Sequence, residues 1–261
     1  MPVALTIAGS DTGGGAGIQA DLKTFAALGV HGTSVVTCLT AQNPKRILGI
    51  HVCEPRFVQQ QLSAVFEELP PKAIKTGMLY SAEIIRVVVR FLNTCNRQPP
   101  LIVDPVSIAT SGTRLLQPKA AEALLHDLLP LATLVTPNLP EAEALTGCAI
   151  REPEEMRWAA RLIRNEFGCA VLVKGGHLKN AREAVDIFYD GKNELMLTAP
   201  FIPGLSLHGT GCTYSAAITG FLARGCKLPE AASRAKTYIT QAIAHSARAG
   251  KHSVLGCSYF P

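Results

Sequence analysis

The chain is poor in charged and aromatic residues, which make up 17% and 6% of its 261 residues. It has no run of Lys and Arg with interleaved aromatic side chains, so a nucleic-acid partner is not expected. The eight cysteines form no CxxC pair and no Cys/His ligand spacing, which argues against a zinc site and a disulfide scaffold. No apolar run is long enough to cross a bilayer, and the start lacks the basic and apolar segments of a signal peptide. We therefore expect a cytoplasmic protein without a membrane partner.

Apolar residues, in contrast, make up 48% of the chain, enough to fill a substantial core, and the net charge of +5 suits an anionic substrate. Apolar strand-like runs alternate with amphipathic segments along the whole length. The expected strands are 3–8, 32–39, 47–52, 73–76, 101–103, 134–137, 169–174 and a hairpin of 184–189 with 195–198. The expected helices are 18–28, 55–69, 81–92, 118–129, one reaching Leu145, 154–167, 213–223 and 229–247. This alternation predicts one α/β domain over residues 1–261, with a mostly parallel central sheet covered by helices on both faces, a three-layer αβα sandwich.

The strongest local signal is the stretch His208-Gly209-Thr210-Gly211-Cys212-Thr213, which precedes a helical pattern. A tight glycine turn at a helix start leaves backbone N–H groups unpaired at the positive end of the helix dipole, a site that suits phosphate. At the first turn, the dipole favours the thiolate of Cys212 over the thiol. The alternative is a glycine turn before a buried helix, with a small core cysteine.

Polar residues follow the predicted strands at Asp11, Gln42, Asp104, Asn138 and Lys174. In open α/β sheets, ligands bind beyond the carboxyl ends of the strands, so these residues are expected to share one edge. The loop Gly9–Gly17 is neither a Walker A sequence nor a G-x-G-x-x-G fingerprint, so it favours a small polar substrate over a dinucleotide. An oxidoreductase is therefore the weakest hypothesis.

Seven blocks together carry a resemblance to a known family. They are Gly9–Asp21, Thr40–Asn43, Lys75–Met78, Asp104–Val106, Thr136–Glu141, Val173–His177 and His208–Thr213. In this order and spacing they resemble the hydroxymethylpyrimidine/phosphomethylpyrimidine kinases of thiamine biosynthesis, in the ribokinase-like superfamily. The resemblance implies ATP-dependent phosphorylation of 4-amino-5-hydroxymethyl-2-methylpyrimidine and then of its monophosphate. It also implies Mg²⁺, a ribokinase-like sandwich and a homodimer.

The phosphate and metal roles follow from this resemblance together with residue chemistry. The turn of Gly209, Thr210, Gly211 and Cys212 would hold the transferring phosphoryl group. Lys174 and Asn138 would bind ATP, with Thr210 and Gly211 contributing to the same site. Glu141 would act on Mg²⁺ through water, with Asp104 assisting. Without the family, a capping Asn138 with a first-turn Glu141 is the simpler interpretation.

The substrate roles follow in the same way. Many sugar kinases of the superfamily have Asp where Cys212 stands, so Cys212 is expected to act as base or to orient the substrate hydroxyl. The amide of Gln42 can match the ring nitrogen and the exocyclic amine of an aminopyrimidine. The remaining predicted pocket residues are Gly9, Ala16, Asp21, Met78 and Val106. Ser107 and the pair Ser206-Leu207 depart from the family pattern near the pocket, so its shape and the balance between the two substrates stay open.

Three alternatives remain. Pyridoxal kinase is the nearest, as sole or second activity, because pyridoxal is also a small hydroxymethyl heteroaromatic. A sugar or nucleoside kinase is disfavoured by Cys212. A non-catalytic pyrimidine-binding protein of the same fold is disfavoured by the retained phosphate and metal groups.

Overall fold

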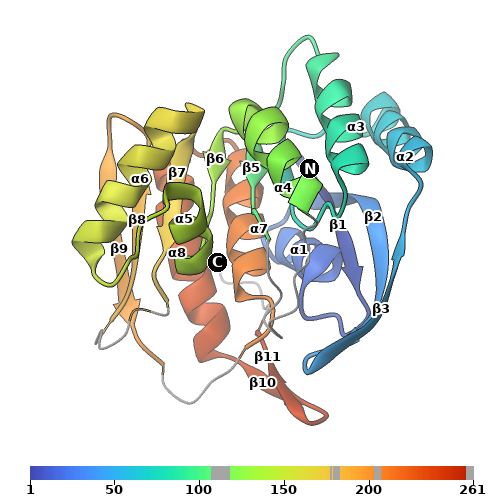
Figure 1. The fold of residues 1–261 in the computed structure, drawn as a ribbon. Coiled ribbons are helices and arrows are strands. Elements are labelled where there is room, and N and C mark those ends of the chain that lie inside the picture. Colours follow the sequence, from blue (N-terminus) through green and yellow to red (C-terminus); the bar gives the residue numbers. More distant parts are fainter. Residues whose placement is uncertain (107–117, 177, 179–182, 203–206, 257–261) are drawn as a thin grey trace.

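A nine-stranded sheet forms the centre of the molecule (Figure 1). The computed structural model describes residues 1–106, 118–176, 178, 183–202 and 207–256. Ser107, most of the expected loop 106–112, His177 and Ser206 lie outside these residues. The strands are β1 Val3–Asp11, β2 His31–Asn43, β3 Arg46–Val52, β4 Ala73–Thr76, β5 Leu101–Val103, β6 Leu134–Val135, β7 Ala170–Lys174, β8 Glu183–Tyr189 and β9 Glu194–Pro200.

The order of the strands is β3-β2-β1-β4-β5-β6-β7-β8-β9. The pairs along β2-β1-β4-β5-β6-β7 are parallel. At one edge β3 pairs antiparallel with β2, and at the other edge β8 pairs antiparallel with β7 and with β9. The predicted mostly parallel sheet and the predicted hairpin are both confirmed.

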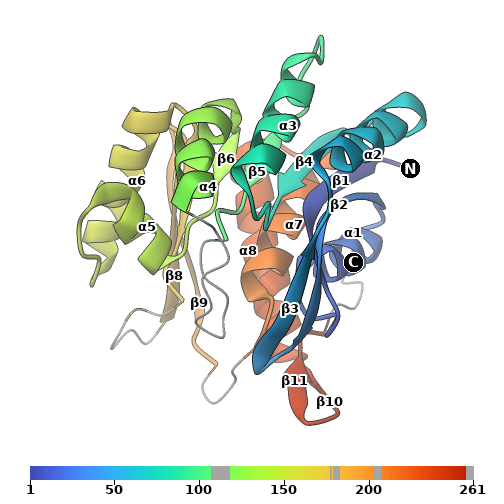
Figure 2. The same cartoon turned by 45° about the vertical axis from the view of Figure 1, so that its right-hand side comes forward.

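Helices cover both faces of this sheet (Figure 2). Their bounds are α1 Gly17–Ala27, α2 Pro55–Glu68, α3 Ala82–Asn93, α4 Pro118–Ala123, α5 Leu139–Thr146, α6 Pro153–Phe167, α7 Thr210–Ala223 and α8 Leu228–Ala244. One core cluster joins α2 to α6 with the sheet, and a second joins α1, α7 and α8 with its other face. This is the predicted three-layer sandwich. Among the described residues, none of the helices combines the length and apolar character needed to cross a membrane.

Local signals explain several helix ends. The Ser81 hydroxyl accepts a hydrogen bond from the backbone N–H of Ile84 (3.3 Å), as its predicted N-cap role requires. Helices α5 and α6 end at Gly147 and Gly168, whose φ angles of 71° and 74° are left-handed and therefore favour glycine.

Two predicted helices extend further toward the C-terminus than the helices of the structure. The segment expected to be one helix over 118–129 leaves α-geometry at Ala123 and continues as a π-helical turn, Leu124–Leu128, and a 3-10 turn, Leu129–Leu131. Pro130 has no backbone N–H to continue an α-helix. Helix α8 ends at Ala244, and an antiparallel hairpin of β10 Ala247–Ala249 and β11 His252–Val254 follows it. The strands of this hairpin are short and not buried, so they carry no apolar alternation in the sequence.

Because β1, β2 and β4 to β7 are parallel, their carboxyl ends lie at one edge of the sheet. Asp11 and Lys174 are the last residues of β1 and β7, and Asp104 directly follows β5. Asn138 forms a parallel bridge with Lys174. The sheet topology therefore brings the predicted polar residues to one edge, where α7 also begins.

Candidate active site

A cavity of about 690 Å³ opens at the carboxyl edge of the sheet. Of the predicted site residues, the cavity is lined by Gly9, Ala16, Gln42, Met78, Asp104, Val106, Asn138, Glu141, Lys174, Gly209, Thr210, Gly211 and Cys212. Asp21 does not line it. The size is that of a site for small molecules.

The turn before α7 presents the predicted anion-binding geometry. Gly209 has a φ of 85°, and the first helical hydrogen bond runs from the N–H of Thr213 to the carbonyl of Gly209 (2.9 Å). The N–H groups of Thr210, Gly211 and Cys212 therefore lie before the first intrahelical bond, at the positive end of the helix. A Cβ atom on Gly211 would lie 3.3 Å from Nζ of Lys174, which places a cation directly beside this turn.

The turn before α7 requires glycine at position 209, and a substitution there can test this requirement. We expect Gly209→Ala to lower the free energy of unfolding by several kcal/mol, because a Cβ atom would overlap the carbonyl oxygen of Gly15 and φ is left-handed. Gly225→Ala is the matched control, since Gly225 has a φ of 92° but no atom within 4 Å of the added Cβ. The control should lose only about 1 kcal/mol. Urea unfolding of both variants measures the difference, and equal losses would contradict the close approach of the two loops.

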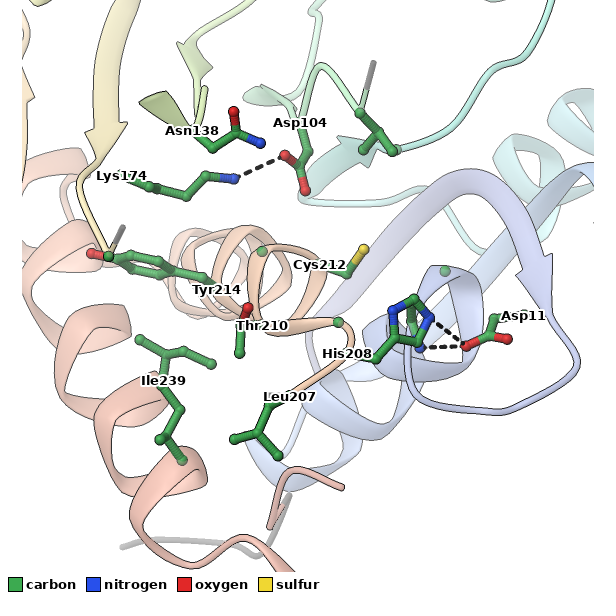
Figure 3. Close-up of a pocket in the computed structure, with 18 of the residues that line it drawn as sticks. Asp11, Asp104, Asn138, Lys174, Leu207, His208, Thr210, Cys212, Tyr214 and Ile239 are labelled. Carbon is green, nitrogen blue, oxygen red and sulfur yellow. Dashed lines mark hydrogen bonds and ion pairs between the residues drawn. The ribbon is translucent and has the colours of Figure 1, made fainter. Parts of the chain in front are cut away.

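Lys174 and Asp104 form an ion pair over this turn, with Nζ 3.1 Å from Oδ1 (Figure 3). The other carboxylate oxygen of Asp104 accepts a hydrogen bond from Oγ of Ser215 on α7 (3.0 Å). Burial favours the neutral acid, but the charges of Lys174 and Lys75 outweigh it and hold the pKa of Asp104 below its ordinary value. The pair is thus charged at neutral pH, and the ammonium group of Lys174 can bind an anion.

Asn138 and Glu141 form the capping box that was the simpler sequence interpretation. Oδ1 of Asn138 accepts from the N–H of Glu141, and Oε2 of Glu141 accepts from the N–H of Asn138, both at 2.9 Å. Both residues also line the cavity, and the charge of Glu141 acts on Lys174. The cap holds these side chains at the cavity wall, so it is compatible with a ligand role.

Asp21 is a correction to the predicted pocket. Its carboxylate is fully buried on the inner face of α1, where it pairs with Nζ of Lys75 at 2.6 Å and accepts from Oγ1 of Thr6 at 2.6 Å. These contacts leave the carboxylate buried and outside the cavity lining. The pair instead fixes Lys75, which lines the cavity at the end of β4.

For Cys212, burial opposes the effect expected from the helix dipole. Burial raises the pKa of this thiol to about 11, even though the charge of Lys75 and the backbone N–H of Gly17 favour the thiolate. Desolvation therefore outweighs the helix dipole, and a pKa raised in this way favours the thiol at neutral pH.

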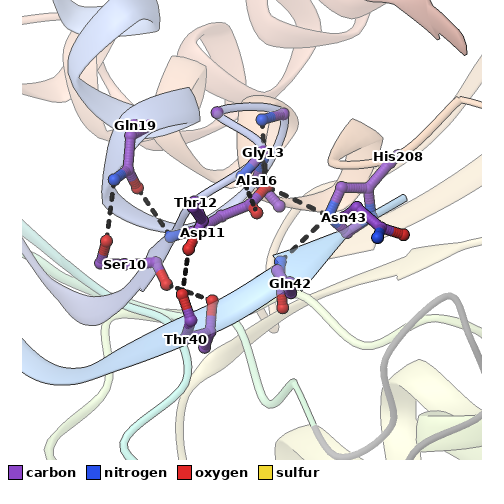
Figure 4. Close-up of polar contacts among 12 residues, drawn as sticks. Ser10, Asp11, Thr12, Gly13, Ala16, Gln19, Thr40, Gln42, Asn43 and His208 are labelled. Carbon is purple, nitrogen blue, oxygen red and sulfur yellow. Dashed lines mark hydrogen bonds and ion pairs between the residues drawn. The ribbon is translucent and has the colours of Figure 1, made fainter. Parts of the chain in front are cut away.

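Asp11 organises the glycine loop (Figure 4). Its carboxylate accepts hydrogen bonds from the backbone N–H groups of Gly13 (2.8 Å), Gly15 (3.0 Å) and Ala16 (2.8 Å). Nε2 of His208, the residue before the anion-binding turn, lies 3.3 Å from the same carboxylate. Asp11 thus links the loop after β1 to the start of α7, a role that the sequence analysis did not assign.

A second cluster lines the cavity on the side of α8. Nζ of Lys236 lies 2.7 Å from Oδ2 of Asp186, and the N–H of Gly175 donates to Oδ1 of Asp186 (3.0 Å). Burial, together with the charge of Asp186, raises the pKa of Tyr214 well above its ordinary value. The sequence analysis missed these residues. The available signals were charged residues inside otherwise apolar patterns, namely Lys75 in β4, Asp186 in β8 and Lys236 on the buried face of α8.

Comparison with known protein sequences gives a consistent match. The family model described as phosphomethylpyrimidine kinase matches residues 11–255. A hydroxymethylpyrimidine/phosphomethylpyrimidine kinase of Rhizobium meliloti is 50% identical, covering 94% of this chain and 92% of that protein. The thiamine biosynthesis bifunctional protein ThiED of Geobacter sulfurreducens is 51% identical over 92% of this chain, which spans 48% of the length of that protein.

Solved structures match in the same way. The phosphomethylpyrimidine kinase of Clostridium difficile has a TM-score of 0.82 and 44% identity, covering 93% of this chain and all of that one. The pyridoxal kinase of Staphylococcus aureus in complex with AMP-PCP and pyridoxal has a TM-score of 0.89 and 34% identity, covering 99% and 94%. With its parallel sheet and its glycine turn at the start of α7, the chain belongs to the phosphomethylpyrimidine kinase family and has the ribokinase-like fold.

Proposed function

We propose that this protein phosphorylates 4-amino-5-hydroxymethyl-2-methylpyrimidine with ATP, and then its monophosphate, to give the diphosphate used in thiamine biosynthesis. The observation that carries the proposal is one cavity lined by the N-terminal turn of α7, Lys174, Cys212 and Gln42. Such a cavity offers an anion site and an amide for an aminopyrimidine beside a group that can orient an alcohol.

Phosphoryl transfer depends mainly on positioning and charge neutralisation. The γ-phosphoryl group would lie on the N–H groups of Thr210, Gly211 and Cys212, with Lys174 neutralising its charge. The substrate hydroxyl oxygen would form a bond to phosphorus as the bond to the β-phosphate oxygen breaks and ADP leaves, and the hydroxyl proton would pass to an oxygen of the transferred phosphoryl group and from there to water. Since Cys212 is a protonated thiol, it would orient the hydroxyl by accepting a hydrogen bond at sulfur rather than remove the proton beforehand.

The carboxylates present are compatible with Mg²⁺. Asp104 and Glu141 both line the cavity, and the charges of both act on Lys174, which supports a role for them beside a metal bound to ATP phosphates. The described residues contain no group of three or more His, Cys, Asp or Glu side chains that could hold a metal ion. Mg²⁺ commonly keeps its waters and binds through one or two carboxylates and substrate phosphates. The ion would neutralise phosphate charge, with Glu141 reached through water and Asp104 assisting.

Following ATP and the pyrimidine by ³¹P NMR tests the proposal directly. We expect the monophosphate to appear first and the diphosphate to follow while ATP declines. Accumulation of the monophosphate without any diphosphate would contradict the second transfer. Binding of the pyrimidine without ADP release would instead favour a non-catalytic binding protein.

Pyridoxal phosphorylation is a second candidate activity, because the pyridoxal kinase named above superposes with a TM-score of 0.89 over 99% of this chain. The same NMR assay with pyridoxal in place of the pyrimidine distinguishes a second activity from a single one.

A cytoplasmic homodimer completes the proposal. The exposed side chains of Leu39 and Leu48, on the neighbouring strands β2 and β3, supply apolar surface that a second copy could cover. Light scattering coupled to size-exclusion chromatography would give the oligomeric state.

A further inference from the structure

A buried ion pair lines the cavity on the side of α8 and takes no part in the transfer proposed above. Its members are Asp186 on β8 and Lys236 on α8, whose side chains are only 4% and 10% exposed. Nζ of Lys236 donates to Oδ2 of Asp186 (2.7 Å) and to the carbonyl of Ala184 (2.9 Å). Apolar residues of similar size are often at least as stabilising as a buried ion pair. Stability alone is therefore a weak explanation for these two charges.

The second carboxylate oxygen of Asp186 connects this pair to the phosphate side of the cavity. Oδ1 accepts a hydrogen bond from the backbone N–H of Gly175 (3.0 Å), and Gly175 directly follows Lys174, the last residue of β7. Asp186 is also the residue opposite Lys174 in the antiparallel pairing of β7 with β8. The bond to Gly175 therefore extends the contact between the two strands by one residue beyond Lys174.

Gly175 lies tightly against β8 and has little room to move. A Cβ atom on Gly175 would overlap the carbonyl oxygen of Val185 and would lie 2.7 Å from Cε of Met156, so only glycine permits this approach. Because Gly175 is buried, its N–H needs a partner within the protein. Asp186 supplies that partner. Without an acceptor at position 186, the backbone that follows Lys174 would have to shift toward water or another acceptor.

Lys174 is held from two other directions as well. Its own N–H donates to the carbonyl of Pro137 (2.9 Å), and its Nζ lies 3.1 Å from Oδ1 of Asp104 (Figure 3). The bond from Gly175 to Asp186 adds a third anchor, on the C-terminal side of Lys174. The position of the ammonium group therefore depends on the backbone at both sides of this residue.

We propose that Asp186, held in place by Lys236, is a positioning residue for Lys174. Its hydrogen bond to Gly175 fixes the backbone from which the ammonium group of Lys174 reaches the turn before α7. The inference rests on the proposed function, in which Lys174 neutralises the transferring phosphoryl group. It adds a residue that acts on the transfer through Lys174.

The experiment uses two double variants that both remove the buried charges. Asp186→Asn/Lys236→Met keeps an oxygen that can accept from the N–H of Gly175, whereas Asp186→Leu/Lys236→Met has a similar shape and no acceptor. The Leu variant should lose on the order of 10²-fold in kcat/KM for ATP, because the cation is misplaced, and the Asn variant should stay within about tenfold of the wild type. Initial rates at saturating pyrimidine and varied ATP concentration measure both losses.

A matched background separates positioning from general stability. The same two pairs of substitutions are compared in protein that already carries Lys174→Met/Asp104→Asn, which lacks the ammonium group. If Asp186 acts through Lys174, the Leu and Asn variants should there differ by less than about threefold. A merely structural role predicts the same ratio in both backgrounds. Thermal melting establishes that each variant is folded.

Deuterium exchange at the N–H of Gly175 in the wild-type protein is a test that needs no variant. Slow exchange is expected, and exchange as fast as in an unstructured chain would overturn the inference. Equal kcat/KM of the two double variants, or the same ratio in both backgrounds, would overturn it as well. Absence of phosphoryl transfer by the wild-type protein would instead contradict the proposed function. The dissociation constant of ATP would then carry the same comparison, with weaker binding expected for the Leu variant.

Discussion

Replacing Lys174 with Met is expected to lower kcat/KM for the pyrimidine by about 10²- to 10³-fold, the effect of removing one preorganised charge from a phosphoryl site. The reason is geometric: Nζ of Lys174 lies directly beside Gly211 in the turn that begins α7. Initial rates at saturating ATP and varied pyrimidine concentration measure this loss.

The control for this prediction separates charge from stability. Lys174→Met leaves Asp104 buried without its partner, which costs about 3–5 kcal/mol of unfolding free energy. The double variant Lys174→Met/Asp104→Asn removes the unpaired charge and should recover much of the stability, while its activity stays low. Recovery of activity together with stability would show that Lys174 serves the fold and not the transfer.

Replacing Cys212 with Ala is expected to lower kcat about 10²-fold, because the substrate hydroxyl loses the group that orients it. Cys212→Ser keeps a polar atom at the same place and should stay within about tenfold of the wild type. Near-normal turnover in both variants would contradict any role of Cys212 in the transfer.

The pH profile of kcat distinguishes orientation from base catalysis. Burial raises the pKa of the Cys212 thiol to about 11. If the thiolate were the required base, its fraction and therefore kcat would rise about tenfold for each pH unit between 7 and 9. A thiol that only orients the hydroxyl gives no such rise. We expect a pH profile of kcat without this rise. If a rise is observed and Cys212→Ser abolishes it, the thiolate of Cys212 is its source and the orienting role is contradicted.

Much of the fold was predictable because its signals are local. The alternation of apolar runs with amphipathic segments predicted the sandwich, and the N-cap at Ser81 follows from residues within one turn. The hairpin after α8 was missed, since its strands are short and not buried. The shared edge of Asp104, Asn138 and Lys174 was also predictable, because parallel strands end on the same side of a sheet.

The sequence by itself thus determined the layers, the edge that carries the cavity and the glycine turn at the start of α7. Only the tertiary structure decided that Asp21 is buried against Lys75, 54 residues away, that burial raises the pKa of Cys212, and that Asp11 lies 3.3 Å from the ring of His208. These properties depend on which distant groups meet and on how much water each loses. Desolvation and long-range pairing arise only when the elements pack, so no pattern within one segment specifies them.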